Sequence, residues 1–599
     1  MVFVFLRHMK KTLFILFLFI SQISIGKEIN YNLSMPKPQN HYFHVEMCLE
    51  GFKEKEIIVK LPVWAPGSYL VREFSKNINQ VRVLNELDKP LKIKKTAKNS
   101  WKIKTNGAKS IRVFYEVYAF ELSVRTSFLD LTHGFVSGAG IFMYVEKHKS
   151  HSGKVKIIPY TGFNEITTAL PLISKSNKDN SSTFSYKDFD QLVDCPIEIG
   201  NQEIFKFEAS GIPHTVAIYG DGNYSVSKLK TDMKKIVEEA TAVFGVNPNK
   251  KYTFIIHNVV NGQGGLEHVN STVLSVNRWT YSGADYIGFL SLVAHEYFHL
   301  WNVKRIRPIE LGPFNYDEEN YTSLLWVMEG FTSYYDELLL LRAGYYSIQE
   351  YLSKLQSKIN YVEGSTGSRV QPLAHASYDA WIKAYRPNEN SANTSMSYYS
   401  RGQVIAAIMD IKIIANSNGE KNLDDFMQHL YMKYYKSKKR GFSEEEFKKE
   451  LSLFTKENLD AFFRKYIDGT EIPPYNDIFQ KVGMKVAYIG MAETSFGGTL
   501  RQSGGKLIVS KIRTNSSCEN AGISVNDEII SCMGYRMNKG MFESILYGLE
   551  VGDKIEVLIA RDEIVFPVEI TMNSYEQPRF KIQYADDEKN ASLRNKWLE

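Results

Sequence analysis

The stretch His295-Glu296-Tyr297-Phe298-His299 is the segment around which the chain is organised. Its two histidines are four residues apart, so on a helix they project from one face, about one turn apart. That spacing lets both imidazoles reach a single Zn²⁺, and Glu296 is placed to act as general base toward a metal-bound water. With 13 His and 67 Asp and Glu in 599 residues, random placement gives roughly 0.03 such matches.

The residues around this motif predict a helix at the border between a core and a cleft. Apolar side chains at helical spacing form one buried stripe, and the two histidines lie on the adjacent, less apolar face. The stripe consists of Ile287, Leu290, Ala294, Tyr297 and Trp301. The alternative is a pair of core histidines whose hydrogen bonds are satisfied and which bind no metal.

A zinc site needs a third protein ligand and an open position. A helix expected over residues 321–341, together with the loop before it, offers four carboxylates: Glu318, Glu319, Glu329 and Asp336. Glu329 is the lone carboxylate in an otherwise uncharged run, where burial is costly unless the group is paired or ligating. Glu318 and Glu319 belong to an acidic loop that is typical of a solvated helix start. We therefore predict Glu329 as the third ligand.

Two aromatic stretches have an open interpretation. A helix is expected to begin near Tyr398-Tyr399-Ser400-Arg401-Gly402, where a tyrosine hydroxyl could stabilise an oxyanion or the rings could simply pack. The stretch Trp64-Ala65-Pro66-Gly67-Ser68-Tyr69 precedes Arg72. It is either a packed loop that locks a sheet edge or a segment whose Tyr69 and Arg72 border the cleft.

Composition and the N-terminus limit the class of protein. The chain is 44% hydrophobic and 23% charged, as expected of a folded protein, and its net charge of +6 is not gathered into a basic run. We expect no nucleic-acid partner. Residues 1–26 read as a signal peptide, with a basic segment, an apolar segment at 13–20 and a small-residue cleavage pattern. We expect a periplasmic or secreted protein without a stable membrane anchor after cleavage; the alternative is an uncleaved anchor.

The pattern along the chain predicts a multidomain α+β protein. Residues 27–200 alternate with period two, which indicates an N-terminal β-sandwich domain. Residues 201–476 turn mainly helical and hold the metal motif. Residues 477–575 form a further unit of short strands, and residues 576–599 a charged tail with a short helix. The four cysteines could pair as Cys48 with Cys195 and Cys518 with Cys532, or stay free.

Several ordered motifs resemble the glycyl aminopeptidase family of gluzincin zinc metallopeptidases with a C-terminal PDZ domain. The resemblance covers nearly all of the chain after residue 26. It is carried by Trp64 to Tyr69, Gly264-Gly265-Leu266-Glu267-His268, His295 to Pro308, Leu325 to Tyr335, Tyr378 to Asn390, and Tyr398-Tyr399. It implies a thermolysin-like zinc-peptidase domain at 201–476 and a PDZ domain at 477–575, whose signature is Ala521-Gly522-Ile523 before Asp527-Glu528-Ile529-Ile530.

The resemblance also implies roles for individual residues. One Zn²⁺ per chain would be held by His295, His299 and Glu329, and Glu296 would activate the zinc-bound water. Glu267, at the end of a Gly-rich edge strand that includes Gly265, would bind the substrate α-amine. Tyr399 would stabilise the oxyanion, with Tyr398 as the second choice. The spacing used by larger zinc aminopeptidases would select Glu318 as third ligand, but the Glu329-Gly330-Phe331-Thr332 context matches the family.

The implied activity is an aminopeptidase that removes N-terminal Gly and Ala from peptides with a free N-terminus. The PDZ unit would bind a peptide C-terminus near Phe496-Gly497-Gly498-Thr499 or dock within the molecule. This loop departs from the usual Gly-Leu-Gly-Phe form. Two alternatives remain: an exported zinc endopeptidase whose PDZ unit captures substrate, and a non-catalytic PDZ adaptor with a structural metal.

Overall fold

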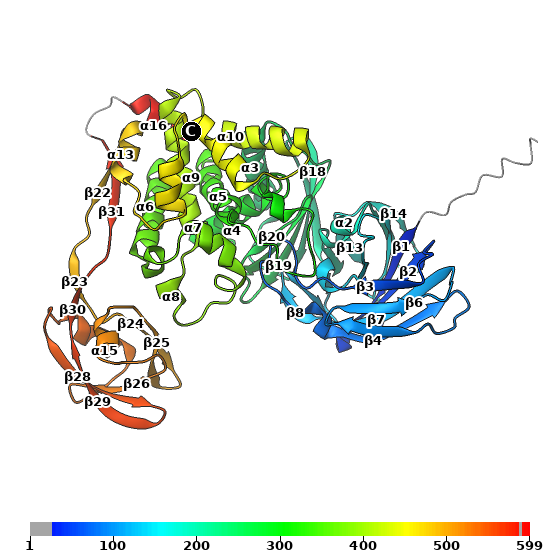
Figure 1. Cartoon of the computed structure of the whole chain (residues 1–599), viewed down its shortest axis with the longest axis horizontal. Helices are drawn as coiled ribbons and strands as arrows, with labels where there is room; N and C mark the ends of the chain where they lie inside the picture. The colour runs from blue at the N-terminus through cyan, green and yellow to red at the C-terminus, as the bar shows by residue number, and fades with distance from the viewer. Residues whose placement is uncertain (1–26, 586–589) are drawn as a thin grey trace, which may run out of the picture.

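The computed structural model describes residues 27–585 and 590–599, so the predicted signal peptide lies outside the described residues. Three bodies follow one another along the chain: a β-rich N-terminal part, a larger part of helices around a five-stranded sheet, and a smaller β unit (Figure 1). The expected combination of a β-rich N-terminal part and a helical part after it is confirmed. Within the described residues, no helix is long and apolar enough to span a membrane.

Three sheets surround one core in the β-rich part. Alternating burial along its longest strands puts every second side chain into this core, as the period-two pattern predicts. The seven-stranded sheet has the order β14 (Leu172–Lys175), β15 (Ser182–Tyr186), β12 (Gly153–Ile158), β1 (Glu28–Ser34), β2 (Tyr42–Glu50), β7 (Ser110–Tyr118) and β4 (Ile78–Asn85). The four-stranded sheet has the order β11 (Tyr144–Val145), β3 (Glu56–Lys60), β6 (Ser100–Lys104) and β5 (Ile93–Ala97).

The third sheet of this part connects it to the next. It has the order β13 (Glu165–Thr168), β16 (Ile197–Gly200), β10 (Gly134–Val136), β9 (Thr126–Leu129) and β8 (Phe120–Ser123). A separate small core joins Phe135 of β10 to apolar side chains of the following sheet, among them Ile255 and Leu266. The two sheets therefore pack directly on each other.

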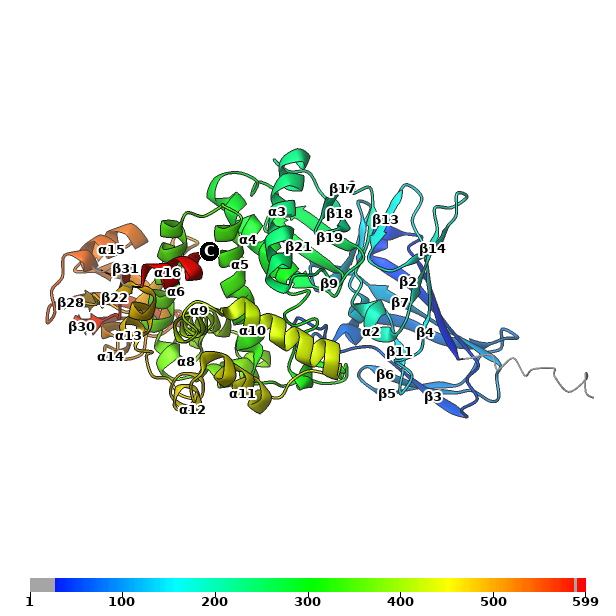
Figure 2. The ribbon, with the colours of Figure 1, turned by 90° about the horizontal axis from the view of Figure 1, so that it is seen from above.

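The second body begins with a mixed sheet that ends in a short open edge. Its order is β17 (Glu203–Ala209), β18 (Ile212–Tyr219), β19 (Tyr252–Val259), β21 (Ser271–Asn277) and β20 (Gly265–Glu267). Helix α3 (Val226–Phe244) lies against this sheet (Figure 2). Strand β20 pairs with β21 on one side only, so it is an edge strand of this sheet.

The rest of the second body consists mainly of helices. They are α4 (Gly283–Phe298), α5 (Phe331–Arg342), α6 (Ile348–Gly364), α9 (Tyr398–Asn416), α10 (Leu423–Leu430) and α11 (Glu444–Thr455). Helix α9 is buried over almost its whole length. A wide π-type turn, η5 (Trp326–Gly330), leads directly into α5. The helix expected over 321–341 thus begins later than predicted, because Thr322 Oγ1 accepts the N–H of Leu324 and favours a turn there.

Two glycines let α9 cross the η5 turn at backbone contact. A Cβ atom on Gly330 would lie 2.4 Å from Gly402 Cα, and one on Gly402 would lie 2.5 Å from the Trp326 carbonyl oxygen. Neither position can carry a larger side chain without moving a helix. Because Tyr399 precedes Gly402 by about one turn, this crossing brings Tyr399 close to Glu329, whose charge acts on the tyrosine hydroxyl.

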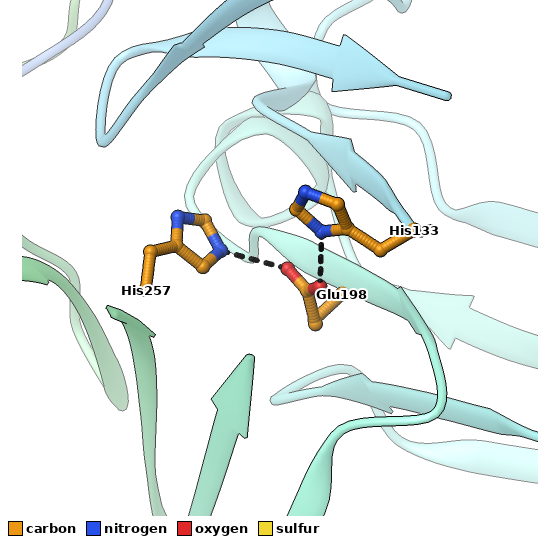
Figure 3. A group of neighbouring side chains, drawn as sticks. All are labelled: His133, Glu198 and His257. Carbon is orange, nitrogen blue, oxygen red and sulfur yellow. Dashed lines mark hydrogen bonds and ion pairs between the residues drawn. The ribbon is translucent and has the colours of Figure 1, made fainter. Parts of the chain in front are cut away.

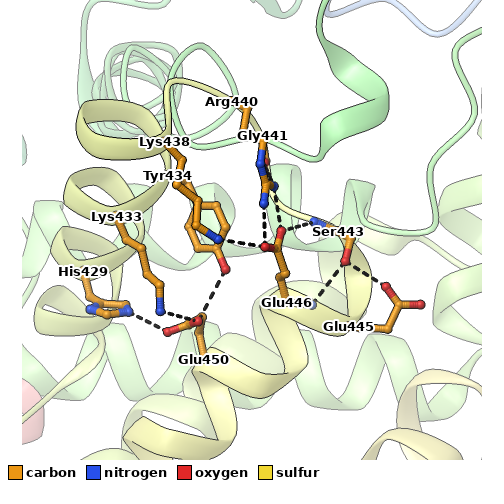
Figure 4. Close-up of polar contacts among 10 residues, drawn as sticks. All are labelled: His429, Lys433, Tyr434, Lys438, Arg440, Gly441, Ser443, Glu445, Glu446 and Glu450. Carbon is orange, nitrogen blue, oxygen red and sulfur yellow. Dashed lines mark hydrogen bonds and ion pairs between the residues drawn. The ribbon is translucent and has the colours of Figure 1, made fainter.

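Ion pairs hold the outer helices α10 and α11 together. The π-type segment η8 (Tyr431–Lys438) extends α10, and its side chains meet two carboxylates of α11 (Figure 4). Glu446 accepts from Arg440 and Lys438 and also completes the N-terminal cap of α11 with Ser443. Glu450 accepts from His429 and Lys433 at 2.7 and 2.6 Å.

The third body is a unit of its own inside the C-terminal region. Its sheet has the order β24 (Gly498–Ser503), β25 (Lys506–Ile512), β26 (Glu528–Cys532), β28 (Lys554–Arg561) and β29 (Ile564–Thr571), with helices α14 (Ser517–Asn520) and α15 (Lys539–Tyr547). The core of this unit is separate from the main helical core. Two strand pairs connect it to the helical part: β22 (Met484–Tyr488) with β31 (Phe580–Tyr584), and β23 (Ala492–Ser495) with β30 (Asn573–Glu576).

The ends of the predicted C-terminal unit differ from the observed packing. Helix α13 (Tyr475–Phe479) and strand β22 belong to the helical core, although the sequence pattern predicts that the C-terminal unit begins at residue 477. Helix α16 (Ala591–Leu598) returns to the same core, where Trp597 is buried and donates to Tyr334 Oη at 3.1 Å. Strand β31 and helix α16 are therefore parts of the packed helical body. All four cysteines are free thiols, so neither considered disulfide is formed.

A fully buried carboxylate joins the β-rich part to the mixed sheet. Glu198 of β16 accepts hydrogen bonds from His133 Nδ1 at 2.6 Å and from His257 Nε2, on β19, at 2.8 Å (Figure 3). Burial alone would raise the pKa of Glu198, but the two histidines hold it below its usual range. The carboxylate is thus ionised, and both imidazoles spend one N–H on it.

Replacing Glu198 by Ala should destabilise the protein, because two imidazole N–H groups lose their partner in a buried site. We expect a loss of about 3 kcal/mol in the free energy of unfolding, measured by denaturant titration. Glu208→Ala on exposed β17 is the matched control and should change little. Equal stability of the two variants would contradict the role of Glu198.

Candidate metal centre and cleft

Helix α4 and turn η5 bring three ligand atoms to one point. The Nε2 atoms of His295 and His299 are 3.1 Å apart. Glu329 Oε2 lies 3.4 Å from the first and 3.3 Å from the second. A tetrahedral zinc site with ligand distances of about 2.0–2.1 Å has edges of about 3.3 Å. The donor set and its spacing therefore fit a divalent metal.

The Nδ1 atoms of both imidazoles, which point away from the three ligand atoms, each have a hydrogen-bond partner. His295 Nδ1 lies 2.9 Å from Asp336 Oδ2, and His299 Nδ1 donates to the Asn302 carbonyl oxygen at 2.8 Å. An N–H at each Nδ1 leaves a lone pair on each Nε2, which is the state a metal requires. By contrast, one nitrogen of each imidazole in the Glu198 cluster, His133 Nδ1 and His257 Nε2, donates a hydrogen bond to the carboxylate, at distances shorter than the tetrahedral edge. That second His-Glu-His group is a hydrogen-bonded brace.

The side chain of Asn302 fixes the wide turn that carries Glu329. Its Nδ2 lies 3.0 Å from the carbonyl oxygens of Val327 and Met328 and from Thr332 Oγ1. A π-type turn leaves carbonyl groups without the usual helical partner, and such turns are frequent at functional sites. Asn302 supplies donors to these carbonyls while its own carbonyl orients His299. One buried residue thus sets the relation between two of the three ligand atoms.

The pKa values of two buried glutamates in the site are shifted in opposite directions. Burial favours the neutral form of Glu329, but the adjacent His299 and His295 hold its pKa below its usual range. For Glu296, burial outweighs the attraction of the same histidines and raises the pKa. Glu296 Oε2 is buried without a hydrogen-bond partner among the described residues. Glu329 is therefore suited to bind a cation, and Glu296 to accept and release a proton.

The cleft beside this centre is a cavity of about 350 Å³ whose wall includes strand β20. A Cβ on Gly265 would lie 2.4 Å from Glu296 Cδ, so the absence of a side chain there makes room for Glu296. Glu267, 4% exposed, lines the cleft. One carboxylate oxygen each of Glu267 and Glu296 and one nitrogen of His299 lie within 4.8 Å of one another.

The β-rich part contributes to the cleft through Gly67. A Cβ on Gly67, which has φ +86°, would lie 2.4 Å from Glu267 Oε1. The same loop buries Trp64 and Tyr69 in the main core, where Tyr69 packs against Trp381. The aromatic residues of this stretch are packed, as the first interpretation has it. Neither Tyr69 nor Arg72 lines the cleft: Arg72 lines a second cavity, and Gly67 is the residue of the loop that reaches the cleft.

The two candidate tyrosines have different surroundings. Tyr399 lines the cleft, and its ring lies 6.3 Å from that of His295. Tyr398 is 1% exposed, belongs to the hydrophobic core, and stacks at 4.8 Å on Tyr399. Its hydroxyl has no hydrogen-bond partner among the described residues. The geometry favours Tyr399 as the group that could reach a ligand in the cleft.

Some residues of the site were not expected, and one candidate lies elsewhere. Glu318 is on an exposed loop, where it accepts from Asn315 Nδ2 at 2.8 Å. Asp336, one of the four carboxylates that the sequence offers as a third ligand, instead contacts the outer nitrogen of His295. Asp336 follows Glu329 by seven residues, so both lie on one helix face. This spacing is the feature of the sequence that could have predicted the position of Asp336 near the metal ligands. Asn302 and Tyr385 lie in stretches that carry the family resemblance, which gave them no individual role, and Arg125 lies outside those stretches.

Two family matches cover the parts that carry this geometry. Residues 30–201 match the Peptidase M61 N-terminal domain, and residues 288–405 match the M61 glycyl aminopeptidase. No curated protein sequence matches the chain.

Solved structures resemble the chain at two levels. An aminopeptidase N family protein from Idiomarina loihiensis is 28% identical with a TM-score of 0.88, over 95% of this chain and 100% of its own. An M1 zinc metallopeptidase from Deinococcus radiodurans is 12% identical with a TM-score of 0.49, over 75% of this chain and 96% of its own. Yeast LTA4 hydrolase is also 12% identical, with a TM-score of 0.48, over 75% and 68%. The last two likenesses are too distant to bear on function.

The site and these matches define an enzyme of the metallopeptidase class, of aminopeptidase type. Both family matches, at residues 30–201 and 288–405, are to domains of peptidase family M61.

The choice between the two candidate third ligands can be tested by metal content. Glu329→Gln removes a charged ligand atom, so we expect the bound metal to fall well below the about one ion per chain of the unaltered protein. Glu318→Gln is the matched control and should keep its metal. Both are measured by metal analysis after dialysis. Loss of metal from the Glu318 variant alone would reverse the assignment.

Proposed function

We propose that the protein is a zinc aminopeptidase that removes N-terminal Gly and Ala from peptides. The observation that carries this proposal is the position of Glu267, a carboxylate that lines the cleft with one oxygen within 4.8 Å of a carboxylate oxygen of Glu296 and a nitrogen of His299. Such a group can pair with a substrate ammonium and fix its distance from the reacting carbonyl. The family description supports the preference for glycine.

His295, His299 and Glu329 would hold the zinc ion, which would supply Lewis acidity toward the scissile carbonyl and toward water. Their fit rests on the converging Nε2 and Oε2 atoms and on the protonated outer nitrogens described above. Asp336 and Asn302 keep both rings in the orientation and tautomer that this requires.

The other groups of the site move protons and stabilise charge. Glu296 accepts a proton from the attacking water and returns it to the leaving amine; its raised pKa suits both steps. Tyr399 donates a hydrogen bond to the oxyanion that develops on the carbonyl oxygen. Gly265 leaves the space that Glu296 occupies, and the open edge of β20 accepts the substrate backbone.

We further propose an exported, periplasmic or secreted protein and a PDZ-type role for residues 477–575. Edge strand β24 follows the Phe496-Gly497-Gly498-Thr499 loop, and Phe542 of α15 packs on Phe496 at 5.3 Å. This arrangement supports binding of a peptide C-terminus by strand addition. Docking within the molecule is supported by Asn393, which bonds to the Ile512 carbonyl and the Thr514 amide at 2.7 and 3.0 Å.

Replacing Glu296 by Gln should stop hydrolysis without releasing the metal. We expect kcat on Gly and Ala anilides to fall by about 10³-fold or more, because the general base is lost, with metal content unchanged. Glu318→Gln, measured in parallel, should keep its activity. Unchanged turnover in the Glu296 variant would exclude this mechanism.

Recognition of the free amine can be tested through Glu267. We expect Glu267→Gln to lower kcat/KM on Gly-Ala-Ala by about 10- to 100-fold, since a charge-assisted hydrogen bond becomes a neutral one. The unaltered enzyme should leave N-acetyl-Gly-Ala-Ala uncut. Efficient cleavage of the acetylated peptide would favour an endopeptidase, and absence of hydrolysis from all substrates would favour a non-catalytic adaptor.

A further inference from the structure

A second cavity lies beside the cleft, between the β-rich part and the helical part. It measures about 380 Å³, and its wall includes four side chains of interest: Arg72, Lys76, Tyr385 and Arg386. One carboxylate, Glu121, also lines it. The lining is thus more cationic than anionic, in a protein whose +6 charge is otherwise spread widely.

Two guanidinium groups between the cleft and this cavity have no carboxylate partner. Arg72 donates to Ser68 Oγ at 3.1 Å, and Arg125 donates to the Gly265 carbonyl at 3.1 Å. The Nε atoms of both are buried without a hydrogen-bond partner in the described part of the chain. Across residues 27–585 and 590–599, neither side chain forms an ion pair. Half-buried, unpaired arginines of this kind favour an anionic ligand.

The two arginines are also close enough to repel each other. Burial and then the charge of Arg125 lower the pKa of Arg72, whereas Glu121 and Tyr385 act in the opposite direction. An anion bound between the guanidinium groups would relieve this repulsion and use their free donors. A carboxylate fits best, because its two oxygens match the fork of donors on a guanidinium group.

Chain neighbours and one contact between tyrosines place this cavity next to the cleft. Arg125 lines the cleft, and the next residue, Thr126, lines the second cavity. Tyr385 lines the second cavity and interacts through its hydroxyl with Tyr399. Arg125 also bonds to β20, the strand whose open edge would hold substrate. A short peptide whose amine is at Glu267 would therefore extend past Tyr399 toward Arg72.

We propose that the pocket lined by Arg72, Lys76, Tyr385 and Arg386, together with Arg125 of the adjoining cleft, binds the C-terminal carboxylate of a short peptide substrate. This inference rests on the proposed aminopeptidase function and narrows its substrates to di-, tri- and tetrapeptides with a free C-terminus. Glu267 and the arginine pair would then recognise opposite ends of one molecule. The enzyme completes the degradation of peptides that other peptidases have already made short.

The test compares a free carboxylate with its amide on the same peptide. We expect kcat/KM of the unaltered enzyme to be about 10-fold or more higher for Gly-Ala-Ala than for Gly-Ala-Ala-NH2. Arg72→Gln should bring this ratio close to one, and Arg72→Lys should keep part of it. Arg82→Gln, on β4 and outside this pocket, is the matched control and should keep the full ratio.

Three results would overturn the proposal. The first is a ratio near one in the unaltered enzyme, a measurement that needs no variant to fold. The second is an unchanged ratio in Arg72→Gln. The third is a preference for Gly-Ala-Asp-NH2 over Gly-Ala-Asn-NH2 as large as that for the free C-terminus, which would assign the pocket to acidic side chains. Hydrolysis of glycine p-nitroanilide separates these outcomes from failure of the aminopeptidase function itself.

Discussion

The contacts of Asn302 are the constraint on which the candidate metal centre depends. Its carbonyl accepts from His299 Nδ1, and its side chain donates to the carbonyls of the turn that carries Glu329. A histidine on one helix and a glutamate on the next are thereby held in one relation by a fully buried residue. Because the wide turn exposes carbonyls that a regular helix would satisfy, the ligand position and the need for Asn302 arise from the same backbone feature.

The β-rich N-terminal part contributes residues to the lining of the cleft beside the candidate metal centre. Gly67 lies against the carboxylate of Glu267, and Arg125 holds the carbonyl of Gly265 on the open strand. The hydrogen bonds of the fully buried Glu198 and the small core around Phe135 fix the position of the two sheets relative to each other. Recognition of both ends of a substrate would thus depend on a junction between two bodies, where ligand sites commonly form.

Local patterns in the sequence were sufficient for the parts of the site that lie on single helices. The spacing of His295 and His299 follows from helix geometry, and Glu329 stood out as a lone carboxylate in an apolar run. Contacts between elements could not be predicted in this way. The approach of Gly330 to Gly402 joins segments 72 residues apart, and the bond from Arg125 to Gly265 joins segments 140 apart. The burial of Trp597 likewise depends on a core formed mostly by much earlier residues.

The topology of the C-terminal region has a consequence for the order in which the enzyme assembles. The chain leaves the helical core along β22 and returns along β31, so the β unit at 492–576 is an insertion between two segments of that core. Phe580, Trp597 and Leu598 are synthesised after the whole insertion, yet they are buried beside helices made long before. The helical core therefore stays incompletely packed while the inserted unit is synthesised. Its packing is complete only after the segments that follow the insertion, β31 and α16, have been made.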